Sequence, residues 1–301
     1  MKSKHSALIP TLAAMGGNTI FGFSFMFSRL ALNVAAPFVM LMYRFLLAFL
    51  LVGVIALWAR RAGRTDWLRF DLKWKDVFAL VPFGLVQPVA YFLCESYGVS
   101  LTNATVSGVI IALVPIVALG AGALFLKEMP TLRQVLFALL SIAGVTIMTL
   151  QQSAGGGIQP LGILLLIGAV VTGTGFNILS RKLSDRYSAL ERTFVMMLVA
   201  CVAFTGLACA TAAPADLIAP LSSPTFLGAM AYLSVLSSIA AFLLLNFASG
   251  RLPVGKITAF CNLTTVLSVF AGVVFLGESF TWVTLGAAAV IIVGVWGVQK
   301  G

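Results

Sequence analysis

Residues 102–128 read TNATVSGVIIALVPIVALGAGALFLKE, and residues 252–278 read LPVGKITAFCNLTTVLSVFAGVVFLGE. At an offset of 150 residues the two stretches share these identities: Leu113/Leu263, Ala121/Ala271, Gly122/Gly272, Phe125/Phe275, Leu126/Leu276 and Glu128/Glu278. The same offset pairs Phe92 with Phe242 and Leu93 with Leu243. Apolar helices match by chance at some positions, but a shared FLxE ending at one offset indicates an internal repeat. We therefore predict two related halves, residues 1–150 and 151–301.

The composition predicts a membrane protein. The chain has 301 residues, of which 60% are hydrophobic and 9% charged, and its mean hydropathy is +1.08. A soluble domain usually carries about a quarter charged residues. Repeated apolar stretches of about 20 residues are typical of a polytopic helical membrane protein. We therefore expect an all-α polytopic fold in contact with the lipid bilayer.

Polar breaks divide the chain into ten predicted transmembrane helices. In the first half they are residues 7–32, 36–59, 76–98, 102–126 and 131–150. In the second half they are residues 159–180, 189–212, 223–248, 254–276 and 280–298. Because each half has an odd number of spans, the second half is predicted to be inverted in the membrane relative to the first. Inverted repeats are a common design of transporters.

The positive charges predict the orientation. On this map every lysine and arginine falls on one side, except Arg29 on the other side and Arg44 inside a span. The positive-inside rule then places both termini in the cytoplasm and the chain in the inner (plasma) membrane as a multi-pass protein. A net charge of +10 could also indicate a protein that binds nucleic acid. Because the positive-inside rule already accounts for the excess of lysine and arginine, we predict no nucleic-acid partner.

Several kinds of chemistry have little support in the sequence. The four cysteines, Cys94, Cys201, Cys209 and Cys261, lie inside apolar spans and form no CxxC motif, so neither a disulfide framework nor a zinc site is indicated. The single histidine is His5. We expect no metal, no cofactor and no enzymatic activity. The lack of a P-loop argues against an ATP-driven pump.

Further motifs occur in a fixed order along the chain. The second span begins PFVMLMYRFLLA, with Pro37 followed by Arg44, and the sixth ends in SRKL. The fourth and ninth spans end in ALGAGALFLKE and VFAGVVFLGE. Together these motifs resemble the drug/metabolite transporter superfamily, EamA type, over essentially the whole chain.

This resemblance implies ten helices in a 5+5 arrangement and a secondary carrier of small organic solutes, often an exporter of amino acids or related metabolites. It also implies a cavity lined by helices 3, 4, 8 and 9, with helices 1 and 6 beside them. The chain departs from the family in two places. Phe21-Gly22 replaces a frequent Trp-Gly, and Thr265 stands where helix 4 has Pro115.

Glu95 is the acidic residue placed well inside a predicted span. On a helix it shares one face with Gln87 and Tyr91, which lie eight and four residues before it. A charge inside the membrane is costly, so it pairs with another group or lines a wet cavity. Three roles stay open: a structural ion pair with Arg44, binding of a substrate ammonium group, or proton coupling.

Other polar and aromatic residues are candidates for the cavity wall. These substrate-binding candidates are Asn18, Phe25, Asn177, Ser238, Asn262 and Thr265. For the polar ones the alternative is a hydrogen bond between helices. Pro88 and Pro115 are predicted hinges, because proline removes a backbone hydrogen bond from a helix. Glu128 and Glu278 are predicted to bind loop amides at helix ends.

The sequence therefore predicts a secondary transporter that works by alternating access on a small-molecule substrate. An amino acid or related metabolite, exported with possible proton coupling, fits best. A passive channel or facilitator, and a carrier of a sugar or nucleoside-type metabolite, are the alternatives. The sequence predicts neither the coupling ion nor the oligomeric state.

Overall fold

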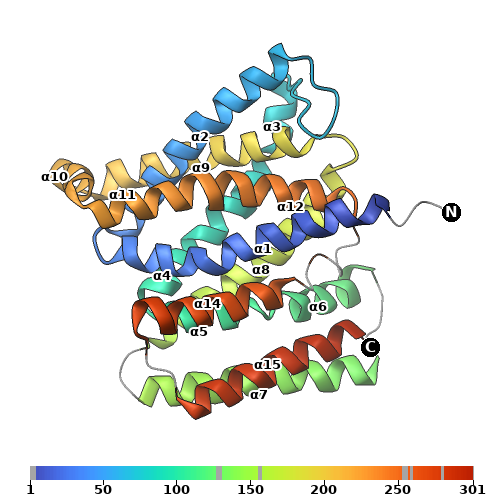
Figure 1. Cartoon of the computed structure of the whole chain (residues 1–301), viewed down its shortest axis with the longest axis vertical. Helices are drawn as coiled ribbons and strands as arrows, with labels where there is room; N and C mark the ends of the chain where they lie inside the picture. Colours follow the sequence, from blue (N-terminus) through green and yellow to red (C-terminus); the bar gives the residue numbers. More distant parts are fainter. Residues whose placement is uncertain are drawn as a thin grey trace.

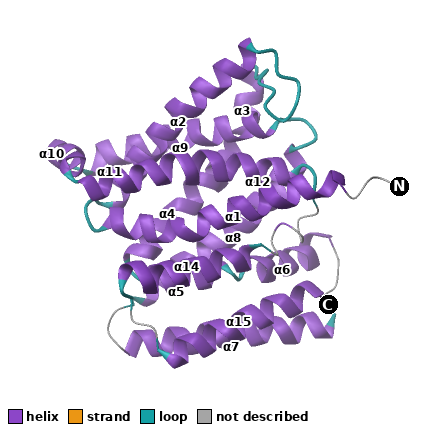
Figure 2. Cartoon of the chain, in the orientation of Figure 1, coloured by secondary structure: helices purple, strands orange, loops and turns teal. Residues whose placement is uncertain are grey.

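A computed structural model describes residues 5–126, 131–154, 158–252, 257, 260–278 and 281–300. In these residues the secondary structure is helical, with no strand (Figure 2). The first half contains α1 (His5–Leu32), α2 (Pro37–Arg61), α3 (Trp74–Gly84), η1 (Leu85–Ala90), α4 (Tyr91–Ser100), α5 (Ala104–Ile111), α6 (Val114–Leu126) and α7 (Leu132–Ala154). The second half contains α8 (Pro160–Leu183), α9 (Ala189–Thr211), α10 (Pro214–Ile218), η2 (Ala219–Ser222), α11 (Pro224–Ala231), η3 (Tyr232–Ala241), α12 (Phe242–Ser249), α14 (Cys261–Leu276) and α15 (Trp282–Lys300).

Seven helical segments in the described residues are long and apolar enough to cross a membrane. They are Leu8–Leu32, Pro37–Arg61, Trp74–Ser100, Ala104–Ala121, Pro160–Leu183, Ala189–Thr211 and Pro224–Ser249. Shorter apolar stretches lie in the remaining long helices, at Leu132–Gly144, Leu263–Leu276 and Leu285–Gly297. Large apolar side chains such as Val54 and Phe78 point outward and are 64% and 71% exposed, which suits contact with lipid. The fold is thus that of a multi-pass membrane protein.

The helices pack in pairs that join distant parts of the chain (Figure 1). α2 packs on α9, and α7 packs on α15, at opposite ends of the view. Between them, α1 contacts α14 and the α11–η3–α12 segment, while α8 contacts α4 and α5. α4 and α8 approach closely at two glycines, because a Cβ on Gly98 would lie 2.7 Å from Leu166 Cγ, and one on Gly162 would lie 2.8 Å from Leu101 Cβ.

Three of the membrane-crossing segments are interrupted. The α3–α4 segment bends at η1, where Gln87 has extended backbone angles (φ −147°, ψ 123°) and precedes Pro88. The segment formed by α5 and α6 is broken just before Pro115, since α5 ends at Ile111 and α6 begins at Val114. The third interruption is the π-helix η3, Tyr232–Ala241. Both predicted proline hinges therefore lie at helix breaks, and hinge motion there remains a prediction.

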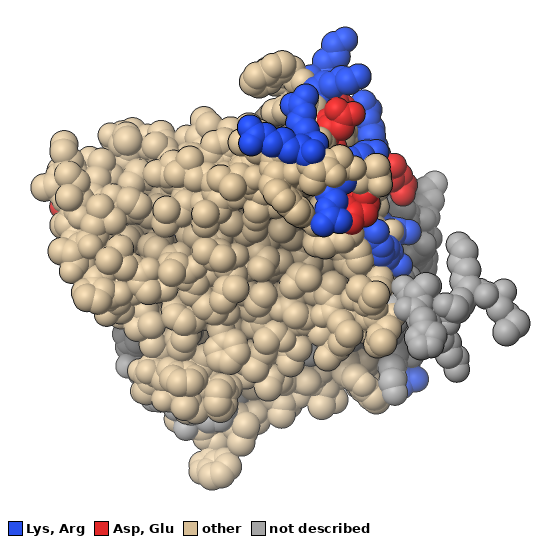
Figure 3. Space-filling model, turned by 45° about the horizontal axis from the view of Figure 1, so that its top comes forward, with Lys and Arg blue, Asp and Glu red and all other residues tan. Residues whose placement is uncertain are grey.

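The charged residues gather at one end of the molecule. Figure 3 shows Lys and Arg there, mixed with a smaller number of Asp and Glu, while the rest of the visible face is almost uncharged. The α2–α3 connection, residues 62–73, and the α8–α9 connection, residues 184–188, meet at this end through hydrogen bonds and an ion pair. The charges thus mark one pole of the helical bundle.

Candidate cavity at the centre of the bundle

A cavity of about 60 Å³ lies among helices of both halves. Its walls come from α1, η1, α4, α5, α6, α8, α12 and α14. The lining residues are Asn18, Phe21, Ser24, Phe25, Gln87, Tyr91, Phe92, Glu95, Ile111, Val114, Gly173, Phe176, Asn177, Leu245, Ile257, Cys261 and Thr264. Six of the residues predicted from the sequence lie together here: Asn18, Phe25, Gln87, Tyr91, Glu95 and Asn177.

Two acceptor groups in this cavity have few partners. Glu95 is 1% exposed, and its Oε2 accepts one hydrogen bond, from Ser96 Oγ at 3.2 Å. Gln87 Oε1 is buried and has no hydrogen-bond partner among the described residues. A buried polar atom without a partner costs about 1–3 kcal/mol. The cavity therefore favours a ligand that donates hydrogen bonds or carries positive charge.

The asparagine side chains are held by neighbouring groups. Asn18 Nδ2 donates to Ala14 O at 2.8 Å, and Thr264 Oγ1 donates to Asn18 O at 2.9 Å. Asn177 Nδ2 donates to Gly173 O at 3.1 Å. Each amide thus bonds the preceding turn of its own helix, which fixes its position on the cavity wall.

Aromatic rings form much of the remaining wall, backed by one buried ring. Phe242 is fully buried. Its centroid lies 5.2 Å from Phe21, 6.3 Å from Phe92 and 5.6 Å from Phe176, each in an edge-to-face arrangement. Such pairs contribute about 0.5–1.5 kcal/mol beyond their buried area. The rings therefore form a connected apolar part of the cavity lining. The sequence analysis missed Phe92 and Phe176, although Phe176 precedes Asn177 directly.

The ion pair between Arg44 and Glu95, one of the three roles left open for Glu95, is not among the ion pairs of the described residues. Arg44 is fully buried; its Nε donates to Ser238 Oγ at 2.9 Å and its Nη2 to Ser237 Oγ at 2.8 Å. Its guanidinium lies over the Phe92 ring, 4.1 Å from the centroid. The hydrogen-bond partners of the guanidinium are thus the two serines of η3, and its face packs on Phe92. Arg44 Nη1 has no hydrogen-bond partner in the described part of the chain.

Two other candidates, Ser238 and Thr265, are placed differently from the prediction. Ser238 binds Arg44 and is not part of the cavity wall. Thr265 Oγ1 donates to Gly108 O at 3.0 Å, so it joins α14 to α5 instead of facing the cavity. The side chain of Asn262 and all of Glu128 lie outside the described residues.

Glu278 joins the two halves at a helix end. Its Oε1 accepts from Ala104 N at 2.8 Å and its Oε2 from Thr105 N at 2.9 Å, at the N-terminus of α5. Gly277, with φ +64°, ends α14 and reverses the direction of the chain. The carboxylate of Glu278 therefore lies next to Gly272, one turn back from the helix end. A carboxylate at a helix N-terminus meets unpaired N–H groups and the positive end of the helix dipole.

We expect Gly272→Ala to destabilise the protein, because the new Cβ would lie 2.5 Å from both Glu278 Oε2 and Thr105 Oγ1. The cost is expected to be about 1–3 kcal/mol, as for other overpacked sites, and thermal unfolding of purified protein measures it. Gly286→Ala is the matched control, since nothing lies within 4 Å of a Cβ there. Equal melting temperatures for the two variants would contradict this account of the glycine.

A second arginine, Arg192, is buried, although the sequence pattern indicated only a positive charge on the cytoplasmic side. Arg192 is 2% exposed. It donates five hydrogen bonds, to Ser188 O, Ser180 O, Ser180 Oγ, Ser249 Oγ and Asn246 O. Four of these acceptors lie near the C-terminal ends of α8 and α12, where free carbonyls and the helix dipole favour a cation. The fifth, Ser188 O, belongs to the N-cap of α9. Arg192 thus joins three helices. The feature of the sequence that could have indicated this network is Asn246, a polar residue inside a predicted span, whose backbone oxygen accepts from Arg192.

The described residues contain no group of three or more His, Cys, Asp or Glu side chains that could hold a metal ion.

Comparison with known proteins identifies the family. The EamA-like transporter family matches the chain twice, over residues 8–150 and 160–299. The uncharacterized transporter YcxC of Bacillus subtilis (strain 168) is 31% identical over 299 residues, covering 98% of this chain and 94% of that protein. An uncharacterized transporter of Archaeoglobus fulgidus is 21% identical, covering 92% of this chain and 94% of that protein.

A solved crystal structure shares the fold with a TM-score of 0.67 at 17% identity, over 98% of this chain and 96% of that one. The family and the names of the relatives indicate a membrane transporter rather than an enzyme. The chain belongs to the EamA-like transporter family.

Proposed function

We propose that this transporter is a secondary carrier that exports a small organic solute, an amino acid or related metabolite, across the inner membrane by alternating access. The observation that carries the proposal is the central cavity, whose lining combines Glu95, Gln87 and Asn177 with phenylalanine rings. Small-molecule sites are commonly apolar clefts with a few convergent polar groups.

The proposal includes ten spans in two inverted halves, 1–150 and 151–301. Packing supports it, because the contacts between the halves are reciprocal. α4 contacts α8 as α12 contacts α1, and α6 contacts α8 as α14 contacts α1. Residues 150 positions apart also touch each other. Phe92 meets Phe242, and Ser141 Oγ donates to Ile291 O at 3.2 Å. Such contacts are expected on the axis that relates two similar halves.

The cavity chemistry favours a solute with an ammonium group. Glu95 supplies a carboxylate and Gln87 an unpartnered oxygen, while the aromatic rings suit a cation or an apolar side chain. An amino acid combines both features. A sugar or nucleoside offers hydrogen-bond donors but no positive charge, so it would make less use of Glu95.

The size of the cavity supports a motion between states. Pockets that enclose drug-sized ligands have volumes of about 300–1,000 Å³, whereas this cavity measures about 60 Å³. A metabolite therefore requires the walls to separate. The breaks at Gln87–Pro88 and before Pro115 lie in two of the wall-forming segments, where helices lack regular hydrogen bonds and bend at low cost.

Counterflow in proteoliposomes tests this proposal. Vesicles loaded with an unlabelled amino acid are expected to accumulate the labelled amino acid transiently, because a carrier exchanges solutes across the membrane. Sugars and nucleosides form the comparison panel, and protein-free vesicles give the baseline. Uptake without counterflow would indicate a channel. Counterflow confined to sugars or nucleosides would refute the amino-acid assignment while leaving the carrier.

A further inference from the structure

Two arginines make equivalent contacts in the two halves of the chain. Arg29 lies in the last turn of α1, and its Nη1 donates to Val99 O and Ser100 O, each at 3.1 Å, at the C-terminal end of α4. Arg181 lies in the last turn of α8, and its Nη1 donates to Ser249 O at 3.0 Å, at the C-terminal end of α12. Val99 and Ser249 are 150 positions apart, so the same contact occurs once in each half.

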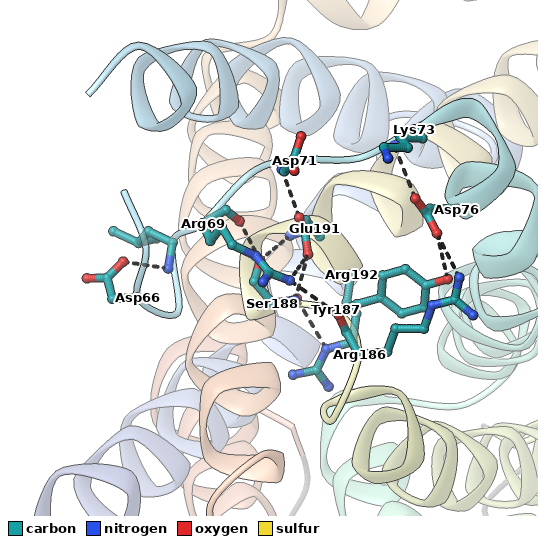
Figure 4. A network of polar contacts seen from close by, with 11 residues as sticks. Asp66, Arg69, Asp71, Lys73, Asp76, Arg186, Tyr187, Ser188, Glu191 and Arg192 are labelled. Atoms are coloured by element: carbon teal, nitrogen blue, oxygen red, sulfur yellow. Dashed lines mark hydrogen bonds and ion pairs between the residues drawn. The ribbon is translucent and has the colours of Figure 1, made fainter. Parts of the chain in front are cut away.

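The two contacts lie at opposite ends of the bundle. Arg181 comes just before the α8–α9 connection, residues 184–188, at the charged end. The segment that Arg29 contacts, Trp74–Ser100, is long enough to cross a membrane. Near its start, Asp76 Oδ1 lies 3.2 Å from Arg186 Nη2 of the α8–α9 connection (Figure 4). Because this segment begins at the charged end, Ser100 and Arg29 lie at the other end, which we call the distal end.

Each arginine also joins helices that face the central cavity. α1 packs on α12, and α8 packs on α4. All four helices contribute to the lining, through Ser24, Leu245, Asn177 and Glu95. Arg29 joins α1 to α4, and Arg181 joins α8 to α12. Each contact therefore holds one of these helix pairs to the other, at one end of the cavity.

A second side chain strengthens the closure at each end. At the charged end, Arg192 donates to Ser180 O of α8 and Asn246 O of α12. Figure 4 shows its guanidinium directed away from Glu191. At the distal end, Glu278 holds the end of α14 to the N-terminus of α5. The structure thus has both ends closed at once, around a cavity of about 60 Å³.

We propose that Arg29 and Arg181 are the two latches of this carrier, and that one opens while the other holds. Arg29 closes the distal end and Arg181 the charged end. The last carbonyls of a helix have no partner within the helix, and the helix dipole favours a cation beside them. Either latch can therefore open without breaking a turn of α4 or α12. Opening of the charged end also has to release Arg192 from α8 or α12. This inference rests on the proposed alternating access, but not on which solute is carried.

The accessibility of a cysteine in the cavity tests the latches. Ser24→Cys places a thiol in the cavity lining, where Ser24 is 5% exposed. The background replaces the native cysteines by alanine: Cys94, Cys201, Cys209 and Cys261. The probe is trimethylammonium-ethyl methanethiosulfonate, whose fixed charge keeps it from crossing a bilayer. It reacts with the thiol when the cavity opens toward the side to which it is added. Native Cys261, which also lines the cavity, is the second reporter, with the other three cysteines replaced.

Membrane vesicles of both orientations separate the two ends. Arg64→Cys in the cysteine-free background is the orientation marker, because Arg64 is exposed in the α2–α3 connection at the charged end. Vesicles in which this marker reacts at once present the charged end to the probe. The sidedness is thus measured in the same preparation as the labelling rate.

Each latch variant is expected to open its own end. Arg29→Gln should raise the labelling rate from the distal end about tenfold, which corresponds to the loss of one hydrogen bond to a charged group. Arg181→Gln should raise the rate from the charged end about threefold. Its effect is smaller because Arg181 is exposed and Arg192 still joins α8 to α12. Neither variant should raise the rate from the opposite end.

Arg251→Gln is the matched control. Arg251 is also an exposed arginine at the charged end, but it donates to Phe247 O, four residues before it, and joins no second helix. Its replacement should change the labelling rate by less than about twofold, as expected for a charge screened by water and salt. An effect equal to that of Arg181→Gln would mean that the charge acts and not the contact, and the proposal would be wrong.

The remaining outcomes also decide between the alternatives. A rise confined to the end of the altered arginine, in both latch variants, supports the two latches. A rise from both ends, a rise in only one variant, or no rise in either overturns them. One-sided opening without amino-acid counterflow would keep the latches and refute the amino-acid assignment. Amino-acid counterflow with unchanged labelling would keep the carrier and refute the latches.

Discussion

Glu95→Gln is expected to lower counterflow about ten- to hundredfold, because it removes the negative charge from the central cavity while nearly preserving shape. The estimate follows from the value of a hydrogen bond to a charged group, about 1.5–3 kcal/mol, at 1.4 kcal/mol per tenfold. Initial rates in proteoliposomes measure the loss. If Glu95 also exchanges a proton during transport, the variant should lose the pH response of the wild-type protein.

The groups that face Glu95 matter for the pH experiment. Arg44 acts on it electrostatically without forming an ion pair, and Tyr91 and Cys261 line the same cavity. Asp216→Asn is the control, since Asp216 is an exposed acid on α10 outside the cavity. It should leave both rate and pH response unchanged. Full transport with an unchanged pH response in Glu95→Gln would leave Glu95 with a structural role only.

Arg192→Met is expected to cause the largest loss of stability. The side chain is buried and donates five hydrogen bonds to three helices, so its removal leaves several buried acceptors without donors. Each buried acceptor left without a donor costs about 1–3 kcal/mol, so the loss of several together is expected to cost about 3–5 kcal/mol. At about 2–4 °C per kcal/mol for a chain of this size, the melting temperature should fall by roughly 10 °C.

The control for this variant is Arg181→Met. Arg181 lies one residue from Ser180, but it is exposed and donates to a single acceptor, Ser249 O, at 3.0 Å. A drop of only about 1–3 °C is expected there, on the scale of one partly exposed hydrogen bond. Similar drops for both variants would mean that the buried network contributes little to the stability of the fold.

Hydrophobic runs and proline positions were enough to predict most of the helices. All ten predicted spans contain helix where the structure describes them, because an apolar run in lipid must satisfy its backbone internally. The extended conformation at Gln87 and the π-helix at Tyr232–Ala241 were not predicted. Periodicity assumes regular helix, so it cannot find a local change in hydrogen-bond pattern.

The site was predicted best where a helical face could be read from spacing. Tyr91 and Glu95 lie one turn apart and face the cavity together. The hydrogen-bond partners that a side chain finds on another helix could not be predicted from the spacing of residues along one helix. Arg44 meets Ser237 and Ser238, which are more than 190 positions away, and Thr265 finds a backbone carbonyl of α5. Such choices depend on how helices are rotated against each other, which sequence spacing does not encode.

The repeat offset also explains why the cavity has two unlike sides. Glu95 and Leu245 stand at equivalent positions 150 residues apart, as do Ile111 and Cys261, and all four line the cavity. In a dimer of identical subunits related by a twofold axis, equivalent positions on the two sides of the cavity would carry the same residue. Joining the halves in one chain lets each side diverge, so that a carboxylate faces the solute on one side and a leucine on the other. On the proposed alternating-access mechanism, a solute with one charged end and one apolar end would be held in a single orientation while the two halves move.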